Sequence, residues 1–170
     1  MDAKPLVVVM GVSGSGKSTI GSALAEKLGV AFIDGDDLHP QANVDKMHAG
    51  HPLTDDDRWP WLARVGQALD DAGDDGLVIA CSALKRSYRD AILSEEPRAL
   101  FLHLTASQGL IAGRLEHRDD HFMPPALLDS QFETLEPLGD DEPGVAVDVG
   151  EDVAHVVSSS VDALRVLQRR

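Results

Sequence analysis

Several residue types are scarce in this 170-residue chain, and each scarcity excludes a class of protein. The single cysteine, Cys81, allows no intramolecular disulfide and no multi-cysteine metal site. No apolar run approaches the about 18 residues of a membrane-spanning helix, and no signal peptide is recognisable, so we expect a soluble, cytoplasmic protein with no membrane contact. Basic residues number 15 against 29 acidic ones, and the resulting net charge of -14 argues against nucleic-acid binding.

Hydrophobic residues make up 43% of the chain, which is enough for the core of one domain. Short apolar runs alternate with helical patterns, and this alternation is typical of an α/β fold with a doubly wound parallel sheet. Strands are expected near residues 6–10, 31–34, 77–81, 99–104 and 145–149. Helices are expected near residues 17–28, 58–72, 86–94, 107–117, 125–134 and 151–168. Residues 35–57 form an insertion rich in Asp, His, Pro and Gly, which suits a substrate-binding segment.

The most informative motif occupies residues 11–18, which read Gly-Val-Ser-Gly-Ser-Gly-Lys-Ser and fit the phosphate-loop pattern GxxxxGK[ST]. It lies between a strand-like run and a helical pattern, where glycines let backbone N–H groups approach a polyphosphate at a helix N-terminus. Lys17 would reach the β- and γ-phosphates, and Ser18 would bind Mg²⁺. The motif therefore predicts ATP and Mg²⁺ as ligands. The predicted ATP-binding residues of this loop are Gly11, Ser13, Gly14, Ser15, Gly16, Lys17, Ser18 and Thr19.

Two carboxylates, Asp34 and Asp36, follow the second expected strand. Ligands of open α/β sheets bind at the carboxyl ends of the strands, so both residues are expected near the phosphates. Because the chain turns at Gly35, the two side chains are expected to have separate roles. A helix cap or a turn is the alternative for such residues.

Cations cluster in two short segments of this acidic chain. Lys85, Arg86 and Arg89 fall at the start of an expected helix, where positive charge opposes the helix dipole, and a nearby anion would remove the conflict. Arg114 and Arg118 stand four residues apart at the end of another expected helix, where cations also serve as dipole partners. The acidic runs, including residues 55–57 and 140–142, are interpreted mainly as solvated helix ends and loops.

Four segments together resemble the gluconate kinases: residues 11–19, 32–62, 81–90 and 114–137. The stretches that carry the resemblance include Asp34-Gly35-Asp36-Asp37-Leu38-His39-Pro40, Leu53-Thr54-Asp55-Asp56-Asp57-Arg58-Trp59-Pro60-Trp61-Leu62, Cys81-Ser82-Ala83-Leu84-Lys85-Arg86-Ser87-Tyr88-Arg89-Asp90 and His121-Phe122-Met123-Pro124. The resemblance implies ATP-dependent phosphorylation of D-gluconate at its terminal hydroxyl. It also implies a three-layer α/β/α P-loop kinase fold with a five-stranded parallel sheet, similar to shikimate and nucleoside monophosphate kinases. Members of this family are often dimers, so a homodimer is possible by resemblance.

The resemblance further implies roles for individual residues. Asp34 would hold a Mg²⁺-bound water, and Asp36 would align the substrate hydroxyl and accept its proton late. Residues 35–62 would bind the substrate, and residues 117–125 would form a lid. Arg118 would stabilise the negative charge of the transition state, and Arg114 would lie beside the adenine. Together with the roles given above, the predicted catalytic residues are Lys17, Asp36 and Arg118. Gluconate is an anion, and the predicted substrate-binding residues are Asp36, His39, Asn43, Arg58, Ser82, Lys85, Arg86, Arg89 and Gln131.

Two rival functions remain to be compared. A regulatory nucleotide switch is disfavoured because the chain has no Asn-Lys-x-Asp stretch and because the strand at 77–81 is followed by Ser82, where a Mg²⁺-binding aspartate would be expected. A shikimate or nucleotide kinase is disfavoured by the segments around His39, Arg58 and His121. His117 and His121 have the spacing of a helical metal pair, but no motif supplies a third ligand.

Overall fold

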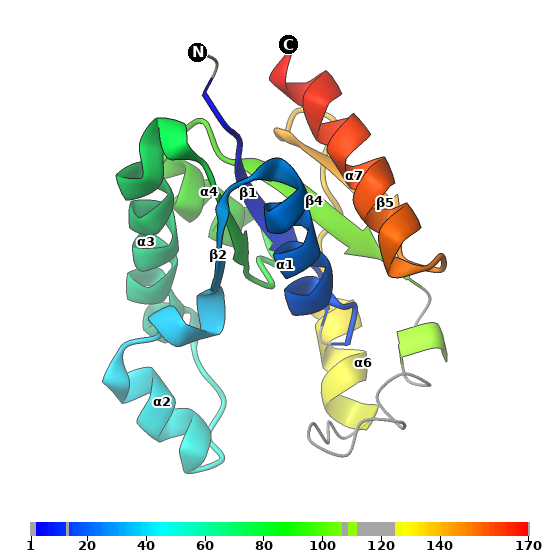
Figure 1. The fold of residues 1–170 in the computed structure, drawn as a ribbon. Coiled ribbons are helices and arrows are strands. Elements are labelled where there is room, and N and C mark those ends of the chain that lie inside the picture. Colours follow the sequence, from blue (N-terminus) through cyan, green and yellow to red (C-terminus); the bar gives the residue numbers. More distant parts are fainter. Residues whose placement is uncertain (1–2, 13, 107–108, 112–124, 170) are drawn as a thin grey trace.

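Five parallel strands form the centre of the molecule (Figure 1). They are β1 (Leu6–Met10), β2 (Ala31–Asp34), β3 (Leu77–Ala80), β4 (Leu100–Thr105) and β5 (Gly144–Asp148), in the order β2-β3-β1-β4-β5. The computed structural model describes residues 3–12, 14–106, 109–111 and 125–169. Every residue of β1 is buried, as expected for a strand covered on both faces. The five expected strands and their parallel arrangement are confirmed.

The helices of the described residues are α1 (Lys17–Leu28), α2 (Gln41–His48), α3 (Asp55–Ala72), α4 (Arg86–Glu95), α6 (Pro125–Thr134) and α7 (Val153–Gln168), with short 3-10 helices at Gly35–Leu38 and Gly73–Asp75. Helices α3 and α4 cover one face of the sheet, and α1 and α7 cover the other. Successive β1 side chains point to opposite faces, so Val8 packs in a core with α3 and α4, whereas Val9 packs in a core with α1 and α7. These two cores confirm the three-layer α/β/α fold.

The insertion after β2 contains more regular structure than the sequence indicated. Helix α2, which follows Pro40, was not predicted, and α3 begins at Asp55 instead of residue 58. The early start has a local cause: the Thr54 side chain accepts from the Asp57 backbone N–H, while the Asp57 carboxylate accepts from the Thr54 N–H. Of the helix expected at 107–117, residues 109–111 are helical and the remainder lies largely outside the described residues.

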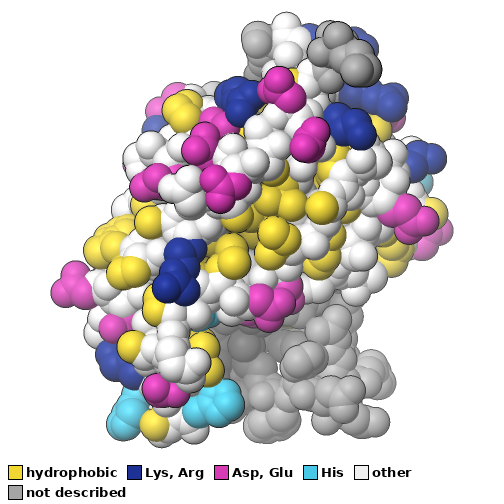
Figure 2. Space-filling model, turned by 60° about the vertical axis from the view of Figure 1, so that its left-hand side comes forward, with side chains coloured by type: hydrophobic (Ala, Val, Ile, Leu, Met, Phe, Trp, Pro, Cys, Tyr) yellow, Lys and Arg dark blue, Asp and Glu magenta, His cyan; other side chains and the backbone are white. Residues whose placement is uncertain are grey.

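Helices α2 and α6 lie at the end of the sheet from which α1 starts, away from the two chain termini (Figure 1). Figure 2 shows a face with a group of hydrophobic side chains in its middle. Acidic and basic side chains surround this group. Edge strand β2 is less covered than β1, since its residues are exposed or half-buried. Within the described ranges, no helix is both long and apolar enough to cross a membrane.

Candidate active site

The phosphate-binding motif connects β1 to α1 at the carboxyl end of the sheet. Gly14 and Gly16 have φ angles of 83° and 93°, which glycine adopts without steric cost. Gly16 is the N-cap of α1 and offers no side-chain cap, so no capping side chain occupies the place in front of the helix N-terminus where an anion would bind. Ser15 is buried and its hydroxyl donates to Val12 O at 2.7 Å, which fixes the curvature of the loop. The described residues of the loop thus fit the phosphate-binding loop that the motif predicts.

Lys17 and Ser18 open α1 directly beside this loop. The Lys17 ammonium donates to Gly11 O and Val12 O, both at 3.1 Å, which holds it over the loop. The Ser18 hydroxyl donates to Asp34 Oδ2 at 3.2 Å. A hydroxyl and a carboxylate this close offer the oxygen ligands that Mg²⁺ prefers, so these residues fit the expected ion. In the described part of the chain, no three His, Cys, Asp or Glu side chains gather as a metal site, so phosphate and water oxygens would supply the other ligands.

Asp36 lies one short turn beyond Asp34. Its backbone N–H donates to Asp34 Oδ1 at 3.0 Å, so the same carboxylate orients both Ser18 and the start of the 3-10 helix. Desolvation by neighbouring groups and the charge of Asp34 raise the pKa of Asp36, while Lys17 and His39 lower it. Asp36 therefore lies within electrostatic reach of the phosphate-loop lysine and is more basic than an ordinary aspartate. Asp34 and Asp36 have the separate settings that the turn at Gly35 predicts.

A second group of side chains includes His39, which interacts electrostatically with Asp36. The His39 ring stacks on Trp61 with centroids 4.2 Å apart, and Trp61 Nε1 donates to Gly35 O at 2.8 Å. Buried Asn43 uses its Nδ2 to contact His39 Nδ1 at 3.1 Å and Asp57 O at 2.9 Å. Burial lowers the pKa of His39, with a smaller effect of Arg58 in the same direction, so a neutral imidazole is favoured. A neutral ring of this kind exchanges hydrogen bonds with hydroxyl groups.

Four side chains form what we call the Asp55 cluster: Asp55, Arg58, Lys85 and Tyr88. Its Arg58 also acts electrostatically on His39. Asp55 accepts from the Tyr88 hydroxyl at 2.6 Å and from Arg58 Nη1 at 3.3 Å, and its other oxygen lies 3.6 Å from Lys85 Nζ. Arg58 and Lys85 also lie over the Tyr88 ring, at 5.6 and 5.5 Å from its centroid. The cluster thus presents two cations around one carboxylate and one aromatic ring.

Sequence reasoning missed two members of this cluster. Asp55 was interpreted as part of a solvated helix end, and Tyr88 was assigned no role. Desolvation, followed by the hydrogen bond to Asp55, raises the pKa of Tyr88 to about 12. The Tyr88 hydrogen bond is also the main reason that the pKa of Asp55 is lowered. Tyr88 lies one helical turn after Lys85, and that spacing was the available signal.

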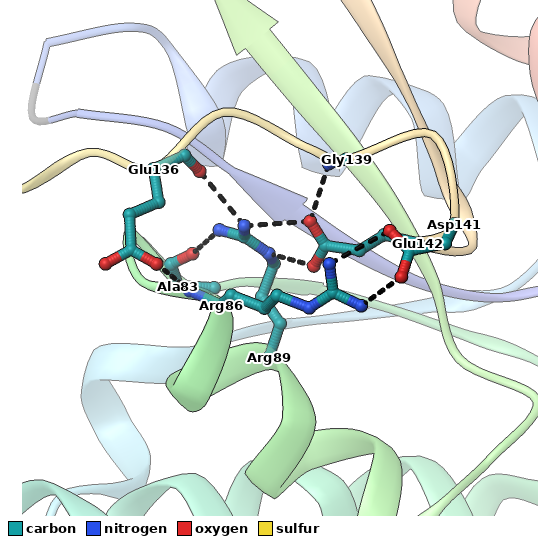
Figure 3. A network of polar contacts seen from close by, with 7 residues as sticks. All are labelled: Ala83, Arg86, Arg89, Glu136, Gly139, Asp141 and Glu142. Atoms are coloured by element: carbon teal, nitrogen blue, oxygen red, sulfur yellow. Dashed lines mark hydrogen bonds and ion pairs between the residues drawn. The ribbon is translucent and has the colours of Figure 1, made fainter.

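Arg86 and Arg89 of α4 form ion pairs with acidic side chains of this same chain (Figure 3). The Arg86 guanidinium pairs with Asp141, while the Arg86 backbone N–H donates to the Glu136 carboxylate at 3.0 Å. Arg89 is fully buried and pairs with Glu142 at 2.6 Å. The prediction that Arg89 contacts the substrate directly is therefore wrong, because no part of its side chain is exposed. The anions that the helix dipole favours are supplied by Glu136, Asp141 and Glu142. Asp141 and Glu142 belong to the acidic run 140–142, which was interpreted mainly as solvated.

The remaining predicted residues are distributed as follows. Ser82 is half-buried, and its carbonyl accepts from the Gly11 N–H at 3.2 Å, so it adjoins the phosphate loop. Thr19 lies exposed on α1, and Gln131 lies half-buried on α6. Ser13, Arg114, Arg118, the His117/His121 pair and residues 117–124 of the expected lid lie outside the described residues.

Comparison with known proteins shows to which family this chain belongs. A family model described as shikimate kinase matches residues 13–139. Gluconokinase of Gluconobacter oxydans (strain 621H) is 52% identical over 151 residues, covering 86% of this chain and 84% of that protein. The chain belongs to the gluconokinase family. Thermosensitive gluconokinase of Escherichia coli (strain K12) is 45% identical, with 95% of this chain and 88% of that protein covered.

Solved structures agree with this family assignment. The crystal structure of a gluconokinase from Sinorhizobium meliloti 1021 has a TM-score of 0.87 and 47% identity, covering 99% of this chain and 97% of that one. Shikimate kinase from Aquifex aeolicus, at 16% identity and a TM-score of 0.59, shares the fold alone. A member of the gluconokinase family is a kinase, so this chain is a phosphotransferase that uses a nucleotide.

Proposed function

We propose that this chain transfers the γ-phosphoryl group of ATP, with Mg²⁺, to the terminal hydroxyl of D-gluconate and so forms 6-phospho-D-gluconate. Relatives that are 52% and 45% identical carry the name gluconokinase. The observation that supports this choice of substrate is a series of neighbouring charges. Asp36 is close enough to act on both Lys17 and His39, His39 in turn feels Arg58, and Asp55 pairs with both Arg58 and Lys85. An acceptor with an anionic group at one end and a hydroxyl at the other suits this arrangement.

The phosphate-loop side would hold the donor. Backbone N–H groups at the start of α1 and the Lys17 ammonium would bind the phosphates, and Ser18 with Asp34 would hold the Mg²⁺. When bound, Mg²⁺ neutralises negative charge on the phosphates. Arg118 and Arg114 remain proposed as the transition-state cation and the adenine neighbour.

Asp36 would bind the hydroxyl of the acceptor. Phosphoryl transfer passes through a loose transition state, so alignment of the hydroxyl matters more than early removal of its proton. The raised pKa of Asp36 makes it a better late proton acceptor than an unperturbed aspartate. Asp36 thus aligns the nucleophile first and takes its proton as the new bond forms.

The far side of the site would recognise the rest of gluconate. The Arg58 guanidinium suits a carboxylate because it donates two parallel hydrogen bonds, and Lys85 adds a second positive charge. His39 would bond to hydroxyl groups of the polyol, with Asn43 holding its ring. Residues 35–62, which contain His39, Asn43 and Arg58, would therefore act as the substrate-binding segment.

One assay tests the proposal against its rivals. The purified protein is given ATP and Mg²⁺ with a panel of sugar acids, nucleoside monophosphates and shikimate, and ADP formation is followed. Gluconate should give the highest kcat/KM, and mass spectrometry with phosphorus NMR should locate the phosphate on the terminal carbon. A preference for shikimate would instead follow the description of the matching family model. ADP release that needs no acceptor would support a nucleotide switch and overturn the proposal.

A further inference from the structure

The turn formed by residues 82–85, between β3 and α4, joins the two halves of the proposed site. At its start, the Ser82 carbonyl accepts from the N–H of Gly11 in the phosphate loop. At its end, Lys85 Nζ lies 3.6 Å from Asp55 in the cluster proposed to bind the substrate carboxylate. The shape of this short turn therefore sets how far Lys85 lies from the phosphate loop.

Ala83, in the middle of the turn, has an unfavourable backbone conformation. Its φ angle is 44°, and it is the one non-glycine residue with a positive φ among those described. Left-handed backbone is costly for a residue with a Cβ, so the surroundings must hold it there. The Ala83 carbonyl accepts from Arg89 Nη1 at 2.9 Å, and the Ala83 backbone also hydrogen-bonds to Cys81, so the Arg89 side chain holds the peptide on the Leu84 side of this residue.

The Arg89 guanidinium is held by hydrogen bonds from each of its three nitrogen atoms (Figure 3). Its Nε and Nη2 donate to the Glu142 carboxylate at 2.6 and 3.0 Å, and Nη2 also donates to Glu136 O at 3.0 Å. Glu142 is buried and accepts in addition from the Gly139 N–H at 2.8 Å. The backbone of Glu136 donates to Leu84 O at 2.7 Å, so residues 136–142 are bonded to the turn both through Arg89 and directly.

We propose that Arg89, oriented by Glu142, is a positioning residue for phosphoryl transfer: it holds Ala83 in the left-handed conformation and thereby fixes Ser82 and Lys85 relative to the phosphate loop. The inference rests on the proposed function. A buried ion pair adds little to stability compared with well-packed apolar side chains, so stability alone does not account for it. The planar fork of arginine explains the residue type, because lysine cannot reach Glu142, Ala83 and Glu136 from one side chain at the same time.

The first test is the kinetics of Arg89→Lys, which keeps the charge and removes the fork. Misplacement of reacting groups by about 1 Å costs up to ~100-fold in rate, so kcat should fall about 10- to 100-fold. The KM for gluconate should rise while the KM for ATP changes little. Arg98→Lys is the matched control, since Arg98 also bonds a buried glutamate, Glu96, but lies beyond the other end of α4. Its kinetics should match the wild type, and all assays are run well below each variant's unfolding temperature.

The second test asks whether a residue that tolerates positive φ at position 83 restores the lost kcat. Glycine adopts positive φ without the penalty of a Cβ, so the Ala83→Gly/Arg89→Lys double variant should recover part of the kcat lost in Arg89→Lys. A role confined to packing predicts no such recovery. Amide hydrogen exchange of residues 82–85 supplies a readout that needs no substrate, and exchange there should be faster in Arg89→Lys than in Arg98→Lys.

Failure of this inference and failure of the proposed function give different results. If the wild type forms ADP without dependence on gluconate, the proposed function is wrong, and the exchange measurement still decides whether Arg89 holds the turn. If Arg89→Lys matches Arg98→Lys in kcat, in both KM values and in exchange, the positioning role is overturned, even if the unfolding temperature falls.

Discussion

The hydroxyl of Tyr88 on α4 donates a 2.6 Å hydrogen bond to Asp55, the first residue of α3. This bond connects the two helices that pack on one face of the sheet, at the end where the substrate is proposed to bind. Asp55 also neutralises part of the charge of Arg58 and Lys85, so both cations are held next to one carboxylate and one net positive charge remains for an anion. The cluster is therefore assembled before any substrate arrives, and binding requires little rearrangement.

The first prediction is that the pKa of Tyr88 lies well above that of an unperturbed tyrosine. Its pKa is raised to about 12, so the neutral phenol is favoured in the folded state, and the resulting stabilisation is present below about pH 10 and lost as the pH rises through 12. Tyr88 is the only tyrosine of the chain, so the near-ultraviolet absorbance of tyrosinate reports on it alone. Asp55→Asn should lower the midpoint, although desolvation still acts. A midpoint near pH 10 in the folded wild type would contradict the prediction.

The second prediction concerns the substrate carboxylate. Arg58→Ala should raise the KM for gluconate about 10- to 100-fold, because a hydrogen bond to a charged group is worth roughly 1.5–3 kcal/mol. The KM for ATP should change far less. Arg64→Ala is the control, since Arg64 is an exposed arginine on the same helix whose Nη1 donates to Leu38 O. An equal rise in both KM values would show that Arg58 does not distinguish the two substrates.

Local patterns of the sequence predicted the sheet and the phosphate loop, because continuous apolar runs identify buried strands and the loop motif is contiguous. Helix α2 was missed because Gln41–His48 is mostly polar and has no apolar stripe. The capping box at Thr54 was readable in the sequence, and it places the start of α3 correctly.

Pairings between distant residues were not predictable in the same way. The helix dipole correctly indicated that the cations of α4 need an anion, but it did not say which one. Glu142 is 53 residues from Arg89, and Asp55 is 33 residues from Tyr88, so no local spacing links either pair. The assignment of Arg89 to the substrate failed for this reason.

The third prediction concerns the acceptor hydroxyl. Asp36→Asn should lower kcat about 100-fold or more, since it removes the proton acceptor and weakens alignment of the nucleophile. Asp37→Asn is a matched control, because Asp37 is the adjacent exposed carboxylate in the same 3-10 helix. Steady-state kinetics at saturating ATP measure both variants. Wild-type kcat and gluconate KM in Asp36→Asn would remove Asp36 from the mechanism.

The fourth prediction concerns Mg²⁺. Ser18→Ala should raise the Mg²⁺ concentration needed for half-maximal activity, because it removes one of the two oxygens proposed to hold the ion. Adding Asp34→Asn to Ser18→Ala should cost less than the sum of the two single effects, since both residues act on the same ion. Ser22→Ala, an exposed serine one turn further along α1, controls for loss of a hydroxyl on this helix. Strictly additive effects would indicate that the two side chains serve different ligands.

The fifth prediction links stability to catalysis at Gly35, the residue between Asp34 and Asp36. A Cβ at this position would lie closer than 3.0 Å to Ala80 O, and the pairing of Asp34 with Ala80 across β2 and β3 leaves that carbonyl little room to move. Gly35→Ala should therefore lower the free energy of unfolding by about 1–3 kcal/mol and also lower kcat, because the shifted backbone carries both carboxylates. Gly109→Ala is the control: Gly109 is helical and a Cβ there meets no atom within 4 Å. Because alanine favours helix over glycine, this control should keep or slightly raise stability. A Gly35→Ala variant with lowered stability but wild-type kcat would show that the positions of Asp34 and Asp36 do not depend on the close approach of β2 and β3.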